Sequence, residues 1–157
     1  MFLIRRLLAA LLLFAMLYLL AGFLSGSFGG PSKEEEEAYV RDFIEFVEAR
    51  AQRIDTADGR RGIPAVRVTV KNNGDKTVTN LMLNVRFLDR NGDPLHEDSL
   101  LLVSEDGYRL NIPLTALEIG PGKVFKWKED MWKIFADVPD KWISGDVEVT
   151  VDHIDYK

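Results

Sequence analysis

The stretch VKNNGDKTVTNLMLNVRFLDRNG, Val70 to Gly92, decides the fold class of this chain. Apolar and polar residues alternate on both sides of an Asn-Gly turn, and a second Asn-Gly pair closes the stretch. Alternation with a period of two places the apolar side chains on one face of a β-strand. An Asn-Gly pair beside such runs is a strong hairpin signal. The residues expected on the buried face after the first turn are Leu81, Leu83, Val85 and Phe87.

The same period of two continues on both sides of this stretch. It is seen in AVRVTV, Ala65 to Val70, and in DVEVTVDHI near the C-terminus, and PLHEDSLLLV is the next strand region after the turn. Roughly six or seven short strands separated by turn signals indicate an antiparallel β-sandwich. No βαβ rhythm and no internal repeat is visible. The sequence therefore predicts a mainly β, antiparallel sandwich domain over residues 63–157, with Val66, Val68 and Val70 on one face of a strand and Val147, Val149 and Val151 on one face of another.

The N-terminus predicts a membrane segment. Residues 7–24 carry no charge and follow Arg5 and Arg6. At about 1.5 Å per residue they nearly span a hydrocarbon core of roughly 30 Å. Residues 1–24 are either a retained anchor or a cleaved signal segment, and a signal core is usually only about 7–15 residues long. The arginines should stay in the cytoplasm, so the cytoplasmic membrane holds residues 7–24 and the rest of the chain is extracytoplasmic.

A linker and an amphipathic helix are expected between the membrane segment and the sandwich. Residues 25–32 are rich in Gly and Ser. Ser32 and Glu35 form a capping box that would begin a helix over residues 33–58. The apolar stripe of this helix would contain Val40, Phe43, Val47 and Ile54. The stripe could cover the following domain or pair with another chain.

Three stretches resemble the FxLYD-type domains of prokaryotic extracytoplasmic proteins. They are KNNGDKTVTNLMLNV, VRFLDRNG and LEIGPGKVFKW. Asp89 precedes the turn at Gly92, and Pro121-Gly122 precedes a strand carrying Phe125, as in that family. The resemblance covers about residues 66–151. It implies a small immunoglobulin-like sandwich outside the cytoplasm, and it implies no active site.

Composition and motifs argue against several classes of function. The chain has no cysteine, which excludes disulfides and thiolate sites. Its net charge of −5 gives no sign of a nucleic-acid-binding surface. The DRNGDP turn resembles the start of a calcium loop, but Pro94 and Leu100 stand where an EF-hand needs Gly and Glu. No nucleophile-elbow motif surrounds a serine. We expect neither enzyme activity nor a bound cofactor or metal.

His153 is the centre of one alternative hypothesis. With Asp152 and Asp155 it could bind a metal ion and support a metal-assisted enzyme if another element supplied ligands. There is no HExxH motif and no paired histidine. Exposed residues at the end of a strand are the simpler interpretation.

Tryptophans and lysines are interleaved between Phe125 and Trp142. Indole rings and lysines suit membrane interfaces, partner pockets or sugar rings. The alternative is that the rings build the core, which the alternation predicts for Phe125 and Trp127. Trp132 and Trp142 are the best candidates for exposure because they flank the breaker DVPD. The candidate partner-binding residues are Lys126, Trp127, Lys128, Trp132, Lys133 and Trp142.

These observations lead to one functional hypothesis and one alternative. The chain is expected to be a membrane-anchored extracytoplasmic module that docks another envelope protein. Its contact surface would be the Trp-Lys region or an exposed sheet edge that accepts a strand. The alternative is a module that binds envelope glycan or lipid.

Overall fold

Seven strands and two helices make up the part of the chain described in the computed structural model, residues 31–143 and 145–157. The predicted anchor and most of the predicted linker lie outside these residues. The elements follow one another as α2 (Lys33–Phe43), β1 (Ile44–Ile54), β2 (Ile63–Asn72), β3 (Val78–Leu88), β4 (Pro94–Ser104), α3 (Glu105–Arg109), β5 (Val124–Lys126), β6 (Lys133–Ile134) and β7 (Val147–Tyr156).

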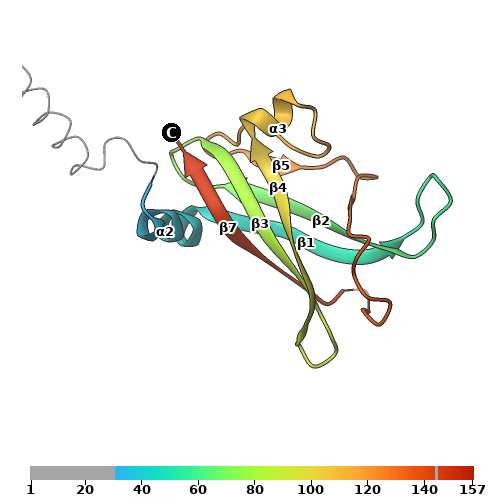
Figure 1. Ribbon diagram of the computed structural model, residues 1–157. Coiled ribbons are helices and arrows are strands. Elements are labelled where there is room, and N and C mark those ends of the chain that lie inside the picture. The colour runs from blue at the N-terminus through green and yellow to red at the C-terminus, as the bar shows by residue number, and fades with distance from the viewer. Residues whose placement is uncertain (1–30, 144) are drawn as a thin grey trace, which may run out of the picture. The chain divides into compact units, whose positions relative to one another are not determined.

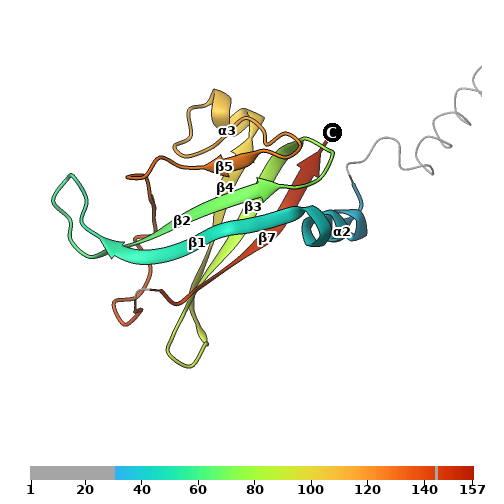
Figure 2. The same cartoon turned by 180° about the vertical axis from the view of Figure 1, so that it is seen from behind.

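The strands form two antiparallel sheets (Figures 1 and 2). One sheet has the order β1-β2-β5, with β6 also paired to β2. The other has the order β4-β3-β7. Helix α2 lies beside β1 and β7, and α3 follows the end of β4 (Figure 1). The prediction of a mainly β domain with antiparallel sheets is confirmed.

The inner faces of the two sheets share one apolar core. The predicted faces of β2 and β3 are confirmed, because all their expected side chains are fully buried: Val66, Val68, Val70, Leu81, Leu83, Val85 and Phe87. Burying each such side chain contributes about 1.5–3 kcal/mol. The valines of β7 alternate with exposed residues as predicted, and each is half-buried.

The predicted hairpin at Asn91-Gly92 joins β3 to β4. Gly92 has φ +86°, which favours glycine. The Asp89 carboxylate accepts hydrogen bonds from the backbone amides of Asn91 at 2.7 Å and Asp93 at 3.0 Å. The hydrogen bonds from Asp93 and Asn91 lower the pKa of Asp89. Turn formation therefore explains the acidic residue that begins this loop.

The predicted helix over residues 33–58 is wrong beyond Phe43. The helix begins at Lys33, directly after Ser32 as expected, but Ile44–Ile54 form strand β1. Asp58-Gly59, expected to end the helix, belongs to the turn between β1 and β2, where the Gly59 amide donates to the Thr56 carbonyl at 2.9 Å.

A β-bulge in β1 explains the error. Phe46 pairs with Val70 and Glu48 with Thr69, so Val47 is the extra residue. A bulge changes the spacing of inward residues from two to three at one point. The residues that pair with the buried positions of β2 are therefore spaced by two, three and two, and the strict alternation that marks a strand is lost: Ile44, Phe46, Ala49 and Ala51. The strand is also favoured because it hydrogen-bonds the edge of β2 along ten paired positions, from Ile44↔Asn72 to Ile54↔Ile63.

Helix α2 is attached to the sheets through Tyr39, which is 4 % exposed. Its hydroxyl donates to the Asn72 side-chain oxygen at 3.0 Å and accepts from the Lys76 amide at 3.3 Å. Burial raises the pKa of Tyr39, so the hydroxyl remains neutral and can donate. The ring also packs on Tyr156, with centroids 4.5 Å apart. Tyr39 thereby fixes the helix to both sheets.

Gly74→Ala is expected to lower the free energy of unfolding by about 2 kcal/mol, because a Cβ at this position would overlap the Tyr39 hydroxyl. Gly74 has no positive φ, so the loss would come from the overlap alone. Urea denaturation measures it. Gly120→Ala is the control, since the nearest atom to its added Cβ is 3.7 Å away. Equal stabilities of the two variants would contradict the packing described here.

Candidate functional site

A second β-bulge, in β7, determines where the C-terminal polar residues point. Met82 pairs with His153 and Leu83 pairs with Val151, so Asp152 is the extra residue. The bulge lets Ile154 enter the core while His153 and Asp155 occupy the outer face of the sheet. The two polar residues are therefore neighbours on one face, two positions apart.

Helix α2 adds a third polar side chain to this pair. The His153 Nδ1 atom lies 3.2 Å from Glu36 Oε2, and its Nε2 atom lies 3.1 Å from Asp155 Oδ2. One ligand atom from each of the three residues can be chosen so that all lie within 4.8 Å of one another. This polar cluster, Glu36, His153 and Asp155, joins α2 to β7, although Glu36 and His153 are 117 positions apart in the sequence.

The surroundings of His153 favour the protonated, positively charged imidazole. Burial lowers the pKa of His153. The hydrogen bonds and negative charges of Asp155 and Glu36 raise this pKa by more than burial lowers it, so the net shift is upward. The side chain of Glu36 is only 18 % exposed, whereas those of His153 and Asp155 are about two-fifths exposed, at 41 % and 40 %. The cluster is thus reachable from solvent and negatively charged when the imidazole is neutral.

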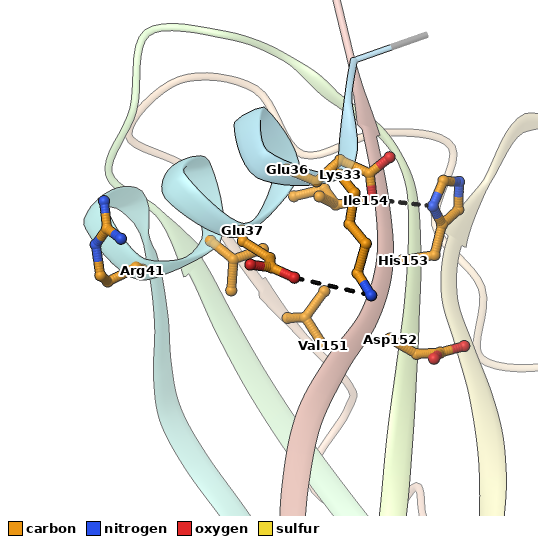
Figure 3. Close-up of a pocket in the computed structure, with 9 residues that line it drawn as sticks. Lys33, Glu36, Glu37, Arg41, Val151, Asp152, His153 and Ile154 are labelled. Atoms are coloured by element: carbon orange, nitrogen blue, oxygen red, sulfur yellow. Dashed lines mark hydrogen bonds and ion pairs between the residues drawn. The ribbon is translucent and has the colours of Figure 1, made fainter.

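A pocket of about 380 Å³ opens beside the polar cluster (Figure 3). Its walls include Lys33, Glu36 and Glu37 from α2 and Asp152 and His153 from β7. Figure 3 shows Glu36 directed to the imidazole, while Lys33 forms an ion pair with Glu37 at 3.9 Å. Asp152, which the sequence grouped with His153, is exposed and stands outside the cluster.

The predicted Trp-Lys surface is largely not formed. Trp127 is 5 % exposed and Trp142 is 2 % exposed, so both belong to the core. This confirms the core interpretation for Trp127 and corrects the expectation that Trp142 is exposed. Trp142 is buried because it packs edge-on against Phe87, with centroids 5.1 Å apart. Trp132 is half-buried.

The lysines of this region do not share a face either. Lys126 pairs with Thr69, and Lys133 pairs with Val66. Directly paired residues point to the same face of a sheet, and Thr69 and Val66 are an odd number of positions apart on β2. Lys126 and Lys133 therefore point to opposite faces. Lys128 lies after the end of β5 and is exposed.

A different apolar surface is present near Trp132. A groove of about 390 Å³ is lined by Ile54, Pro113, Leu114, Met131 and Trp132, with Asp55 and Asp130 among its charged residues. The segment that leads from α3 into this groove carries three exposed apolar side chains, Tyr108 at 54 %, Leu110 at 75 % and Ile112 at 43 %. Together these residues are called the α3 apolar surface.

The backbone of the α3 apolar surface is held in place. Asn111 and Leu114 have positive φ values of 54° and 71°. The Ile112 amide donates to the Gly107 carbonyl at 2.9 Å. The buried Trp127 indole donates to the Leu114 carbonyl, also at 2.9 Å. These two hydrogen bonds hold the backbone of the loop at Ile112 and Leu114.

Sequence reasoning missed Glu36 and the α3 apolar surface. Glu36 is one of four consecutive glutamates, Glu34 to Glu37, and nothing in the sequence distinguishes it from its neighbours. The only available signal for the surface was the density of apolar residues in YRLNIPLTAL, Tyr108 to Leu117.

Comparisons with protein-family models, curated proteins and solved structures found no match to this chain. The resemblance to FxLYD-type domains therefore remains a prediction. Within residues 31–143 and 145–157, no helix is long and apolar enough to span a membrane.

Proposed function

We propose that this protein is a membrane-anchored, extracytoplasmic binding module that docks another envelope protein. The uncharged run at residues 7–24 behind two arginines supports the anchor and its orientation. The two antiparallel sheets support an immunoglobulin-like sandwich of FxLYD type as the binding scaffold. The single observation that carries the binding role is the α3 apolar surface.

The α3 apolar surface has the chemistry of a docking site. Apolar residues clustered in an exposed patch commonly mark sites of interaction with another protein. Aromatic and methionine side chains, here Tyr108, Trp132 and Met131, are enriched at such interfaces. The loop is held by hydrogen bonds, so binding would cost little ordering of the backbone.

The charges of the groove indicate the chemistry of the partner. Asp55 and Asp130 line the groove. Glu105 and Asp106 occupy the first turn of α3, a few residues before the groove residue Pro113 in the sequence. A complementary partner would insert an apolar side chain into the groove and place basic residues beside the two aspartates.

Photo-crosslinking in intact cells tests the docking role. A photoreactive amino acid at the position of Ile112 or Met131 should give one discrete protein adduct. The matched control position is Thr150, which is exposed on the outer face of the other sheet and should give no such adduct. Asp130→Lys should reduce the adduct at position 112 several-fold, because it places a positive charge against a basic partner.

Three outcomes would contradict this proposal. Equal adducts from positions 112 and 150 would show that the α3 apolar surface is not selective. Adducts only to lipid or glycan would favour the alternative function. A tag placed after Lys157 that is protected from external protease in spheroplasts would reject the extracytoplasmic location.

A further inference from the structure

We propose that Glu36, His153 and Asp155 form a binding site for one divalent transition-metal ion of the Zn²⁺ class. The site is independent of the docking role proposed above, since it lies on α2 and β7 rather than on the α3 apolar surface. It differs from the set considered from sequence, because Glu36 replaces Asp152.

The positions of the three ligand atoms carry the proposal. An ion bound by nitrogen and oxygen ligands lies about 2.0–2.2 Å from each of them. Ligands around one ion are then up to about 4.4 Å apart, twice that bond length. The ligand atoms of Glu36, His153 and Asp155 all lie within 4.8 Å of one another. Because Glu36 and Asp155 contact different nitrogens of the ring, the imidazole would turn to direct one nitrogen at the ion while the two carboxylates approach it.

The proximity of the two carboxylates to one imidazole also needs an explanation. Two anionic groups held near each other repel unless a positive charge lies between them. Either the protonated imidazole or a bound cation can supply that charge. A cation would satisfy both carboxylates and an imidazole nitrogen at once, and the test below separates the two.

The residues around the cluster have the features of a supported ligand set. Asn80 on β3 donates a hydrogen bond to Asp155 Oδ2 at 3.2 Å, which fixes the orientation of that carboxylate. The bulge at Asp152 aims His153 outward toward α2. The pocket of about 380 Å³ leaves room for water to complete the coordination of the ion (Figure 3).

The ligand types select the class of ion. One imidazole nitrogen with two carboxylates suits Zn²⁺ and related transition-metal ions, whereas Ca²⁺ and Mg²⁺ prefer oxygen ligands only. Because one ligand lies on α2 and two lie on β7, the ion would hold α2 against β7. Binding that requires the folded arrangement also stabilises it.

Isothermal titration of the full-length, untagged chain in detergent with Zn²⁺ tests the proposal. We expect one ion per chain, a melting temperature that rises with Zn²⁺ concentration, and no such rise with Ca²⁺ or Mg²⁺. Co²⁺ added in place of Zn²⁺ should show the visible absorption of an ion coordinated by protein side chains. His153→Ala should abolish binding, and Glu36→Gln and Asp155→Asn should weaken it strongly. Asn80→Ala should weaken it by about tenfold, as expected of a positioning residue.

Matched controls separate this site from general binding to acidic residues. Glu34→Gln removes an exposed carboxylate of α2 outside the pocket and His96→Gln removes the other histidine, and both should leave the affinity unchanged. Circular dichroism shows whether each variant is folded. If His153→Ala is unfolded, the conservative variants Glu36→Gln and Asp155→Asn show whether these side chains bind the ion. Absence of binding, or equal affinity in the parent and in these two variants, would overturn the proposal and leave the protonated imidazole as the bridging charge.

Discussion

Trp142→Ala is expected to lower the free energy of unfolding by about 4 kcal/mol, the loss typical of a large aromatic side chain removed from a core. The ring is 2 % exposed and packs edge-on against Phe87. Its indole Nε1 donates to the Asp146 carbonyl at 2.9 Å. The Arg53 guanidinium lies 5.6 Å from the ring centroid. The substitution would remove all of these contacts and leave a cavity beside Phe87.

Trp132→Ala is the matched comparison, because this tryptophan is half-buried and lines the groove of the α3 apolar surface. It should lower the free energy of unfolding by about 1 kcal/mol or less and reduce the crosslinked adduct strongly. Urea denaturation followed by circular dichroism measures the first quantity for both variants. A stable Trp142→Ala variant that fails to capture its partner would restore Trp142 as a contact residue and refute the burial described here.

Asn72→Ala is expected to cost about 3 kcal/mol, because the Asn72 side chain forms five hydrogen bonds at a fully buried position. Its amide nitrogen donates to the carbonyls of Lys76 at 2.8 Å, Ile119 at 3.0 Å and Gly120 at 3.3 Å. Its oxygen accepts from the Gly74 amide at 3.0 Å and from the Tyr39 hydroxyl at 3.0 Å. Alanine would leave buried polar groups without these partners.

Asn73→Ala separates the role of Asn72 from a general effect on the turn. Asn73 is exposed and its side chain donates to Glu45 at 2.9 Å, so its loss should cost about 0.5 kcal/mol or less. The same denaturation experiment compares the two variants. In addition, Asn72→Ala should increase hydrogen exchange in α2, since the Tyr39 hydroxyl loses the nearer of its two acceptors. Similar stabilities of the two variants would mean that the buried network is not what holds α2.

The strands were predictable where the alternation is uninterrupted. In β2 and β3 every expected inward residue is buried, because a period of two is sufficient to place side chains when one face meets a core. The hairpin at Asn91-Gly92 was predictable because a turn with positive φ at Gly92 selects that residue pair. These signals are local and require no knowledge of the partner strand.

The errors arise where one extra residue interrupts the alternation. The bulge at Val47 breaks the alternation in β1, so no period of two marks this segment, and only its pairing with β2 shows that it is a strand. The bulge at Asp152 likewise decides which face His153 occupies. The contact of His153 with Glu36 joins opposite ends of the domain, so no local pattern could indicate it. Trp142 was misjudged because a breaker beside it suggested exposure, while Phe87 packs against it.

The exposed edge of β4 determines whether copies of this chain that are crowded in one plane can pair strand to strand. Glu97, Asp98 and Ser99 are exposed along the first half of this strand, and Pro94 begins it. Two such edges approaching each other would bring like charges together, and the proline has no amide proton to offer a neighbouring strand. Copies tethered side by side at high density are therefore expected to remain separate instead of joining into a continuous intermolecular sheet.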